Sequence, residues 1–282
     1  MGDNKIISHK TSKHPGLDRT AFFMLNIHKI KKFKPPLVIA HRGYRKQYPE
    51  NTLSAFEAAV ETRAAMIELD VMLSSDRKPV VIHDATLGRT TNGHGAVNNY
   101  TLEELKQLDA GSWFDAKFAD QRLPELSEVL DLVNGRARVN IEIKASAYEH
   151  HHPPDAIEKQ VVELAKQKNM QASVLLSSFE IDVLAQIASM QNPPAIALIS
   201  KTPASNRTVE ICTHLKVFSW HPDHLIVTPL QVEMMHAAGL KVFPYNVDTF
   251  EDYEKMIDMQ VDGVISDDPV SAGQWARMRN AA

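Results

Sequence analysis

The feature that most constrains the fold of this chain is a regular alternation of short apolar runs with longer amphipathic stretches from residue 37 onward. The apolar runs have the length of strands, and the stretches between them have the spacing of helices with one apolar face. Strands that alternate with helices run parallel, because each helix returns the chain to the same end of the sheet. The pattern therefore predicts an α/β protein.

Nine strands and six helices are predicted from this pattern. The strands are expected at residues 37–41, 66–72, 79–83, 139–144, 173–178, 195–199, 217–220, 241–246 and 263–266. The helices are expected at residues 53–62, 156–168, 181–190, 209–215, 229–238 and 250–259. A closed (β/α)8 barrel has eight parallel strands, so one strand must be explained separately.

The link between the second and third predicted strands decides how many of the nine strands are parallel. Only residues 74–78 separate Leu73 from Pro79, whereas a parallel crossover needs about a dozen residues. These strands must therefore form an antiparallel hairpin, which leaves eight parallel strands. We expect a single (β/α)8 TIM-barrel domain over residues 37–282. An open doubly wound sheet is the alternative, but no Gly-x-Gly-x-x-Gly follows the first strand.

Residues 85–123 interrupt the alternation. Four glycines make this segment loop-rich, and the run from Thr101 to Glu104 is a capping box that starts one short helix ending near Leu108. The segment leaves the hairpin beside the carboxyl ends of the strands, where barrels place their active sites. We expect it to be an insertion that forms a lid or a substrate-specificity element.

Composition and charge exclude several classes of protein. With 282 residues, 44% of them hydrophobic, the chain can bury a full core, and its net charge of -4 argues against nucleic-acid binding. The lone Cys212 cannot form an intramolecular disulfide and is typical of a small buried hydrophobe rather than a nucleophile. The sequence has neither a transmembrane-length apolar run nor a secretory signal pattern. We therefore expect a cytoplasmic protein.

The first 36 residues differ from the rest of the chain. They carry eight Lys or Arg against two Asp, a net charge of +6, and the composition changes at Pro35-Pro36. The run Phe22 to Leu25 followed by four lysines has the pattern of a basic amphipathic helix that makes weak contact with an anionic membrane surface. The alternative is an arm packed on the barrel or partly mobile.

Two predicted strands place carboxylates on one face. Glu68 and Asp70 are two residues apart and point to the same side, as do Asn140, Glu142 and Lys144 on another strand. Each pair alone is typical of a solvated or salt-bridged strand face. Two such strands in a barrel, whose interior is normally apolar, instead favour a site for a hard divalent cation with oxygen ligands.

Two histidines lie near these carboxylates in the predicted fold. A hairpin turn centred between Asp76 and Arg77 places His83 opposite Asp70, where a histidine suits acid-base chemistry. His41 ends the first strand, at the catalytic end of a barrel. Arg42 beside it suits a bidentate grip on phosphate.

The residues around these groups complete the pattern. Gly43 permits close backbone approach or a positive φ. Glu50 adds a carboxylate before Asn51 and Thr52, either of which can cap the next helix. Together these groups indicate metal-assisted cleavage of a phosphodiester.

Two other clusters carry weaker signals. The run from His150 to His152 is expected to be an exposed loop, with a second metal site as the alternative. Trp220-His221-Pro222 lies at a strand end and is a candidate for substrate contact.

The sequence resembles the glycerophosphodiester phosphodiesterase family, a (β/α) barrel family related to phosphoinositide-type phospholipase C. The resemblance runs from Val38 to about Leu130 and resumes at the predicted strands 139–144 and 263–266. It rests on His41-Arg-Gly, Pro49-Glu-Asn-Thr, Glu68-Leu-Asp-Val, His83-Asp, Arg89-Thr-Thr-Asn-Gly, Thr101-Leu-Glu-Glu-Leu, Leu108-Asp-Ala-Gly, Leu123-Pro-Glu-Leu-Ser-Glu-Val-Leu, Asn140-Ile-Glu-Ile-Lys and Gly263-Val-Ile-Ser-Asp-Asp-Pro.

The resemblance implies an enzyme that splits glycerophosphodiesters into sn-glycerol 3-phosphate and an alcohol, and so acts in glycerol and lipid metabolism. It implies one site composed as follows: His41 and His83 as general acid and base, Glu68, Asp70 and Glu142 as ligands of Mg²⁺ or Ca²⁺, Arg42 and Lys144 on the phosphate, and Glu50 as a further metal or supporting group. The segment 85–123 matches the family's insertion, which covers the glycerol side.

Two positions depart from the family pattern. Arg63-Ala-Ala replaces the usual Gly-Ala before the second strand, and the run Val242 to Asp248 replaces a Trp-Thr-Val-Asn-like run. Tyr245 and Asn246 are expected to line the pocket, but this departure leaves the preferred alcohol open. A lysophospholipase D, a phospholipase C-like enzyme on membrane lipid and a non-catalytic phosphodiester-binding barrel are the alternatives.

Overall fold

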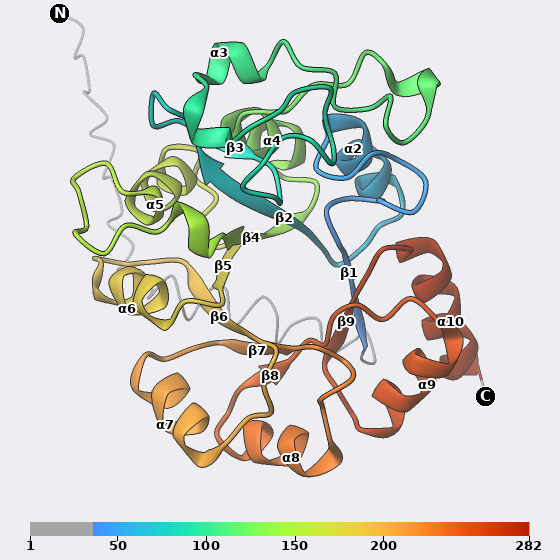
Figure 1. Ribbon diagram of the computed structural model, residues 1–282. Helices are drawn as coiled ribbons and strands as arrows, with labels where there is room; N and C mark the ends of the chain where they lie inside the picture. Colours follow the sequence, from blue (N-terminus) through green and yellow to red (C-terminus); the bar gives the residue numbers. More distant parts are fainter. Residues whose placement is uncertain (1–35, 282) are drawn as a thin grey trace, which may run out of the picture.

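The computed structural model describes residues 36–281. Eight parallel strands form a nearly closed barrel in the order β8-β7-β6-β5-β4-β2-β1-β9, and β3 pairs with β2 beside it. The helices lie around the outside of the strands (Figure 1). The predicted (β/α)8 TIM barrel is therefore confirmed. The expectations for the basic arm fall, apart from Pro36, outside the described residues.

The strands are short and mostly buried. Their bounds are β1 Leu37–Ala40, β2 Met66–Leu73, β3 Pro79–Val81, β4 Arg138–Ile143, β5 Val174–Ser178, β6 Ala195–Ser200, β7 Ser219–Pro222, β8 Lys241–Val242 and β9 Gly263–Ser266.

The α-helices include two, α4 and α10, that the sequence pattern did not predict. Their bounds are α2 Leu53–Glu61, α3 Leu102–Leu105, α4 Leu126–Val133, α5 Ile157–Gln167, α6 Ile181–Ser189, α7 Asn206–His214, α8 Pro229–Ala237, α9 Phe250–Asp258 and α10 Pro269–Ala281. Within residues 36–281, no helix combines the length and the apolar character needed to cross a membrane.

Two backbone hydrogen bonds connect the two edges of the barrel beside β8 and β9, which do not pair as a ladder. Asp262 N donates to Val242 O at 3.0 Å, and Ile265 N donates to Pro244 O at 2.9 Å. The strand predicted over 241–246 is shorter than expected, with Pro244 just beyond its end. A proline has no N–H to donate, so it cannot continue a regular ladder on both sides.

The hairpin is present, but its predicted register is wrong by one residue. Val71 pairs with Val81 and Leu73 with Pro79, so the turn is centred on Asp76. The five-residue loop has an odd length, and its centre is a residue rather than a peptide bond. Ile82 N, not the backbone of His83, therefore donates to Asp70 O, at 3.1 Å.

The barrel interior holds a small apolar cluster beneath its polar end. Its members lie on or next to strands from all sides of the barrel: Ile39, Met66, Leu175, Ala195, Ala197, Phe218, Phe243 and Ile265. A larger apolar layer packs between the strands and the helices. The interior cluster fills the barrel below the site, which restricts polar groups to the carboxyl ends of the strands.

The segment 85–123 lies over β2 and β3 at one side of the barrel (Figure 1). The 3-10 helices η2 Val97–Asn99 and η3 Ala116–Phe118 flank α3 within it. The predicted capping box is present, since Thr101 and Glu104 bond each other's backbone N–H. Phe118 lies against Tyr48, with ring centroids 5.5 Å apart. The segment is therefore attached to the rim of the barrel.

Candidate active site

A cavity of about 570 Å³ opens at the carboxyl ends of the strands. It brings together most of the residues that the sequence analysis selected. Its lining includes His41, Arg42, Glu68, His83, Glu142, Lys144, Tyr245 and Asn246.

Glu68, Asp70 and Glu142 form a compact acidic group. Asp70 and Glu142 are register partners on β2 and β4, and Glu68 lies two residues before Asp70 on the same face. One carboxylate oxygen from each residue lies within 4.8 Å of the other two. All three side chains are buried. Among residues 36–281 this is the one group of three or more acidic, histidine or cysteine side chains close enough to hold a metal ion.

The three carboxylates repel one another, and this repulsion changes their pKa values. Burial raises the pKa of Glu68 well above its usual range, and the charges of Asp70 and Glu142 add to this. Burial and the charge of Asp70 likewise raise the pKa of Glu142 to about 7. For Asp70 burial acts in the same direction, but the charges of Arg42 and Lys144 outweigh it and lower its pKa. The group cannot carry three negative charges at neutral pH without additional positive charge.

This donor set fits a hard divalent cation. Three carboxylates supply the oxygen ligands that Mg²⁺ and Ca²⁺ prefer, and an ion among them would relieve their repulsion. Lys144 supplies part of the positive charge, since its Nζ lies 2.6 Å from Glu142 Oε1 and 3.3 Å from Asp70 Oδ1.

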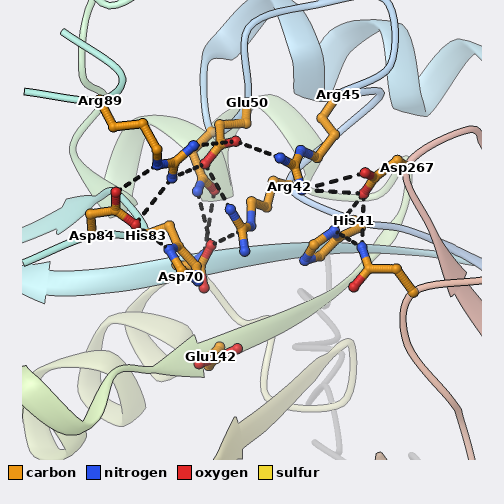
Figure 2. Close-up of polar contacts among 12 residues, drawn as sticks. His41, Arg42, Arg45, Glu50, Asp70, His83, Asp84, Arg89, Glu142 and Asp267 are labelled. Atoms are coloured by element: carbon orange, nitrogen blue, oxygen red, sulfur yellow. Dashed lines mark hydrogen bonds and ion pairs between the residues drawn. The ribbon is translucent and has the colours of Figure 1, made fainter. Parts of the chain in front are cut away.

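His41 is held by a carboxylate at one ring nitrogen. Its Nδ1 lies 2.6 Å from Asp267 Oδ1 (Figure 2). The side-chain amide nitrogen of Asn246 contacts both groups. Its Nε2 lies 4.0 Å from Glu68 Oε2. Burial lowers the pKa of His41, and the hydrogen bond to Asp267 opposes that effect. An Nδ1–H donated to Asp267 leaves Nε2 as the nitrogen that faces the acidic group.

His83 has the same arrangement on the other side of Asp70 (Figure 2). Its Nδ1 lies 2.5 Å from Asp84 Oδ1. The hydrogen bond from Arg89 lowers the pKa of Asp84 to about 2, so Asp84 accepts as a carboxylate. Burial lowers the pKa of His83, and the charge of Asp70 opposes this. His83 therefore lies close to Asp70, as predicted, although the hairpin register differs by one residue from the prediction.

Arg42 lies between two carboxylates at the centre of the site. Its Nη1 donates to Glu50 Oε1 at 2.8 Å, and its Nε lies 3.3 Å from Asp70 Oδ2. Its backbone N–H donates to Glu68 Oε2 at 2.9 Å. Arg42 has a φ of 53°. The main chain and the side chain of Arg42 therefore both contact the acidic group.

Glu50 does not line the cavity and instead binds three arginines. Arg42, Arg45 and Arg89 all lie within 3.0 Å of its carboxylate (Figure 2). Burial favours a raised pKa, but the hydrogen bond from Arg89 and the three positive charges lower the pKa of Glu50 to about 2. Glu50 is therefore ionised, and it links Arg42 to the insertion through Arg89.

The remaining candidates are divided between the cavity and the rest of the fold. His221 lines the cavity, and burial lowers its pKa to about 3, so its ring is neutral. Trp220 is buried in the outer apolar layer instead. Cys212 is buried and burial raises its pKa to about 11, as expected for a structural thiol. His152 Nδ1 lies 3.9 Å from Glu158 and outside the cavity.

Comparison with known proteins gives a consistent result. The model of the glycerophosphoryl diester phosphodiesterase family matches residues 41–271. The chain belongs to this family. It is 42% identical over 234 residues to a glycerophosphodiester phosphodiesterase from Caldanaerobacter subterraneus subsp. tengcongensis, covering 83% of this chain and 94% of that protein.

Other relatives support the same assignment. A glycerophosphodiester phosphodiesterase from Bacillus subtilis is 32% identical over 250 residues, covering 83% of this chain and 84% of that protein. A phosphodiesterase from Oleispira antarctica, solved with the product sn-glycerol-3-phosphate, superposes with a TM-score of 0.76 at 30% identity and covers 86% of this chain and 97% of the other. The chain is accordingly an enzyme, a glycerophosphodiester phosphodiesterase.

Several residues that support this phosphodiesterase site have no role predicted from the sequence. Asp267 and Asp84 bind the two histidines, and Arg45 and Arg89 bind Glu50. Asn51 donates to Asp70 Oδ2 at 2.9 Å, although the sequence pattern indicated only a helix cap at this position. One signal was available: Asp84 adjoins a candidate histidine, and Asp267 directly follows the last parallel strand.

Proposed function

We propose that this phosphodiesterase hydrolyses glycerophosphodiesters to sn-glycerol 3-phosphate and an alcohol, with a divalent cation and with His41 and His83 as general acid and base. The observation that carries the proposal is the pairing of two histidines, each bound at Nδ1 by a carboxylate, around one group of three buried carboxylates. The product bound to the Oleispira antarctica phosphodiesterase supports the same reaction.

Glu68, Asp70 and Glu142 are proposed to hold Mg²⁺ or Ca²⁺. When bound, such an ion supplies positive charge to the phosphoryl oxygens as negative charge develops on them. The raised pKa values of Glu68 and Glu142 support this assignment, because these carboxylates need a cation to remain ionised together.

Arg42 and Lys144 are proposed to bind the phosphate. Both line the cavity beside the acidic group and both carry permanent charge. Burial favours a lowered pKa for Lys144, but the charges of Asp70 and Glu142 raise it, so Lys144 stays protonated. Glu50 is proposed to hold Arg42 in place rather than to contact the substrate.

The two histidines are proposed to divide the proton transfers. One accepts the proton of the attacking water or glycerol 2-hydroxyl as its oxygen bonds to phosphorus, and the other donates a proton to the alcohol oxygen as its bond to phosphorus breaks. In each case Nε2 is the nitrogen available, because Nδ1 is bound to Asp267 or Asp84. Either histidine fits either role.

Replacement of the histidines tests the assignment. We expect His41→Ala and His83→Ala each to lower kcat by about a hundredfold or more, the usual range for a lost acid or base. Circular dichroism and the melting temperature should show intact folding. The exposed His214→Ala on α7 is a matched control and should keep the wild-type rate. A folded His41→Ala protein with near-normal kcat contradicts the acid-base role.

The nucleophile is either water or the glycerol 2-hydroxyl, which attacks internally to give a cyclic phosphate. Brief reaction in heavy-oxygen water distinguishes the two. Heavy oxygen in the first-formed glycerol phosphate identifies water, whereas trapping of a cyclic product identifies internal attack. Both outcomes require cleavage at phosphorus.

The preferred alcohol and the native metal need a direct assay. A panel of choline, ethanolamine, inositol and glycerol diesters, each tested with Mg²⁺ and Ca²⁺, measures both. A lysophospholipid contains the same kind of phosphodiester bond, so the same panel should include one. Faster turnover of the lysophospholipid would favour the lysophospholipase D alternative.

The domain division and location are also proposals. We propose that residues 37–282 form one catalytic domain with an insertion at 85–123, that residues 1–36 are a separate basic arm, and that the protein acts in the cytoplasm. Deletion of residues 1–36 tests the predicted membrane contact. If the arm contacts anionic membranes, the deletion should abolish sedimentation with anionic vesicles and leave turnover of a water-soluble diester unchanged.

A further inference from the structure

The active-site cavity continues into a second hollow on one side. This hollow, of about 440 Å³, lies at the carboxyl ends of β5 and β6. It shares three lining residues with the active-site cavity, namely Phe179, Ile199 and Lys201. A ligand bound at Arg42 and Lys144 can therefore extend past these residues and leave the catalytic cavity.

On the side of His83 the cavity borders a network of ion pairs. There Arg89 bonds to Glu50 and Asp84, and none of the residues of segment 85–123 is among the lining residues of the catalytic cavity. Every glycerophosphodiester has the same glycerol phosphate half, so the half that varies in size is the alcohol. The open side toward β5 and β6 is the part of the site that can accommodate alcohols of different length.

The open side carries positive charge. Lys201 is exposed, and none of the carboxylates within residues 36–281 lies at ion-pair distance from its Nζ. The second hollow is also lined by Arg207, which pairs with Glu210 at 3.2 Å, and it has no acidic lining residue. In the catalytic cavity the acidic lining residues are Glu68 and Glu142, which belong to the proposed metal site. A negative group on the alcohol would therefore meet the positive charge of Lys201, which no carboxylate of the described residues pairs with.

The aromatic wall of the open side is already in contact with a cation. Phe179 and Tyr245 meet edge to face with ring centroids 6.4 Å apart. Lys201 Nζ lies 5.6 Å from the centroid of the Phe179 ring. Aromatic faces of this kind are what proteins use to bind quaternary ammonium groups. Here Lys201 occupies that position and repels a second cation.

We infer that Lys201 determines the substrate class, so that the enzyme prefers an alcohol bearing an anionic group, such as a carboxylate or a second phosphate, over a cationic alcohol such as choline. The inference rests on the proposed function, because it assigns the alcohol half of that substrate. Lys201 acts on affinity for the alcohol and takes no part in proton transfer. Its effect is therefore on the ratio of kcat/KM between substrates.

Three esters of glycerol phosphate isolate the charge of the alcohol. They are the choline ester, the neutral neohexyl ester, in which carbon replaces the choline nitrogen, and the anionic γ-hydroxybutyrate ester. For the wild type we expect kcat/KM to fall in the order hydroxybutyrate, neohexyl, choline, with about tenfold between the extremes for a partly screened charge a few ångströms away. Added salt should reduce this range.

Substitution of Lys201 should change the order. We expect Lys201→Met to bring the three kcat/KM values close together and Lys201→Glu to favour the choline ester. Lys166→Met, an exposed lysine on α5, is the control and should keep the wild-type order. An order that is the same in wild type and both Lys201 variants would overturn the inference and leave the proposed function intact. No hydrolysis of any ester by the wild type would overturn the proposed function, and this inference with it.

Discussion

At the scale of single residues, the two histidines differ in their position along the chain but share one environment. Each has a carboxylate at Nδ1, and in each burial lowers the pKa. A histidine with a lowered pKa is largely unprotonated at neutral pH, which suits a base, whereas the acid must regain a proton before each cycle. The supporting carboxylates are therefore expected to matter almost as much as the histidines.

Asp267→Asn tests this expectation for His41. Asp267 raises the pKa of His41 through its hydrogen bond and its charge, so its loss should move the pKa of His41 to lower pH. We expect kcat to fall about tenfold or more, with one limb of the pH profile of kcat/KM displaced toward acid. Displacement of the acid limb identifies His41 as the base, and displacement of the alkaline limb identifies it as the acid.

The neighbouring carboxylate provides the control for that variant. Asp268 bonds to Lys46 and Ser271 and does not contact His41. Asp268→Asn should leave both limbs of the profile in place. If Asp267→Asn also leaves both limbs unchanged, then Asp267 does not act through His41.

At the scale of secondary-structure elements, the turn after β1 depends on Gly43. The sequence suggested close approach or a positive φ at this position, and the structure shows both: φ is 82°, and a Cβ would lie 2.7 Å from the backbone of Ala55 in α2. The tight packing of this turn on α2 places His41 and Arg42 at the end of the barrel.

Gly43→Ala measures the importance of that packing. Gly135 has a φ of 74°, but no atom lies within 4 Å of the position that a Cβ would take there, so Gly135→Ala adds backbone strain without a clash. We expect Gly135→Ala to cost about 1 kcal/mol of unfolding free energy and Gly43→Ala about 3 kcal/mol or more. Urea denaturation of the two variants measures the difference. Equal losses would show that the contact with α2 has no energetic importance.

Local patterns predicted the elements well where periodicity decides the outcome. The strand at 263–266 and the helix starts at 53, 181, 229 and 250 agree with the structure. Apolar spacing defines these elements, and threonine side chains cap the helices that start at 53, 229 and 250. The hairpin register could not be predicted to one residue, since it depends on the Ser74 to Lys78 hydrogen bond within the loop. The position of Asp267 after the last parallel strand marks it as a candidate, but its contact with His41 could not be predicted, because the two residues are 226 positions apart.

At the scale of the whole molecule, the proposed metal site predicts that metal binding and stability are coupled. Three buried carboxylates repel one another in the folded state, and a cation that binds only the folded state stabilises it by mass action. At a metal concentration of about a hundred times Kd the gain is about 2.7 kcal/mol. For a domain of this size that corresponds to a rise in Tm of about 5 to 10 °C.

Removal of metal tests this coupling without reference to activity. We expect a chelator to lower Tm by that amount and added Mg²⁺ or Ca²⁺ to restore it. Glu142→Gln should abolish most of the metal-dependent shift, whereas Glu163→Gln, an exposed carboxylate on α5, should retain it. A Tm that is insensitive to chelator and to both metals would argue against the proposed metal site.

Phosphorus NMR of glycerophosphoglycerol mixed with the purified protein follows the proposed reaction directly. We expect the diester signal to be replaced by that of glycerol 3-phosphate when Mg²⁺ or Ca²⁺ is present. We expect a chelator to stop the conversion and His41→Ala not to support it. Persistence of the diester signal with either metal, or equal conversion in the presence of chelator, would contradict the central claim of a metal-dependent phosphodiesterase.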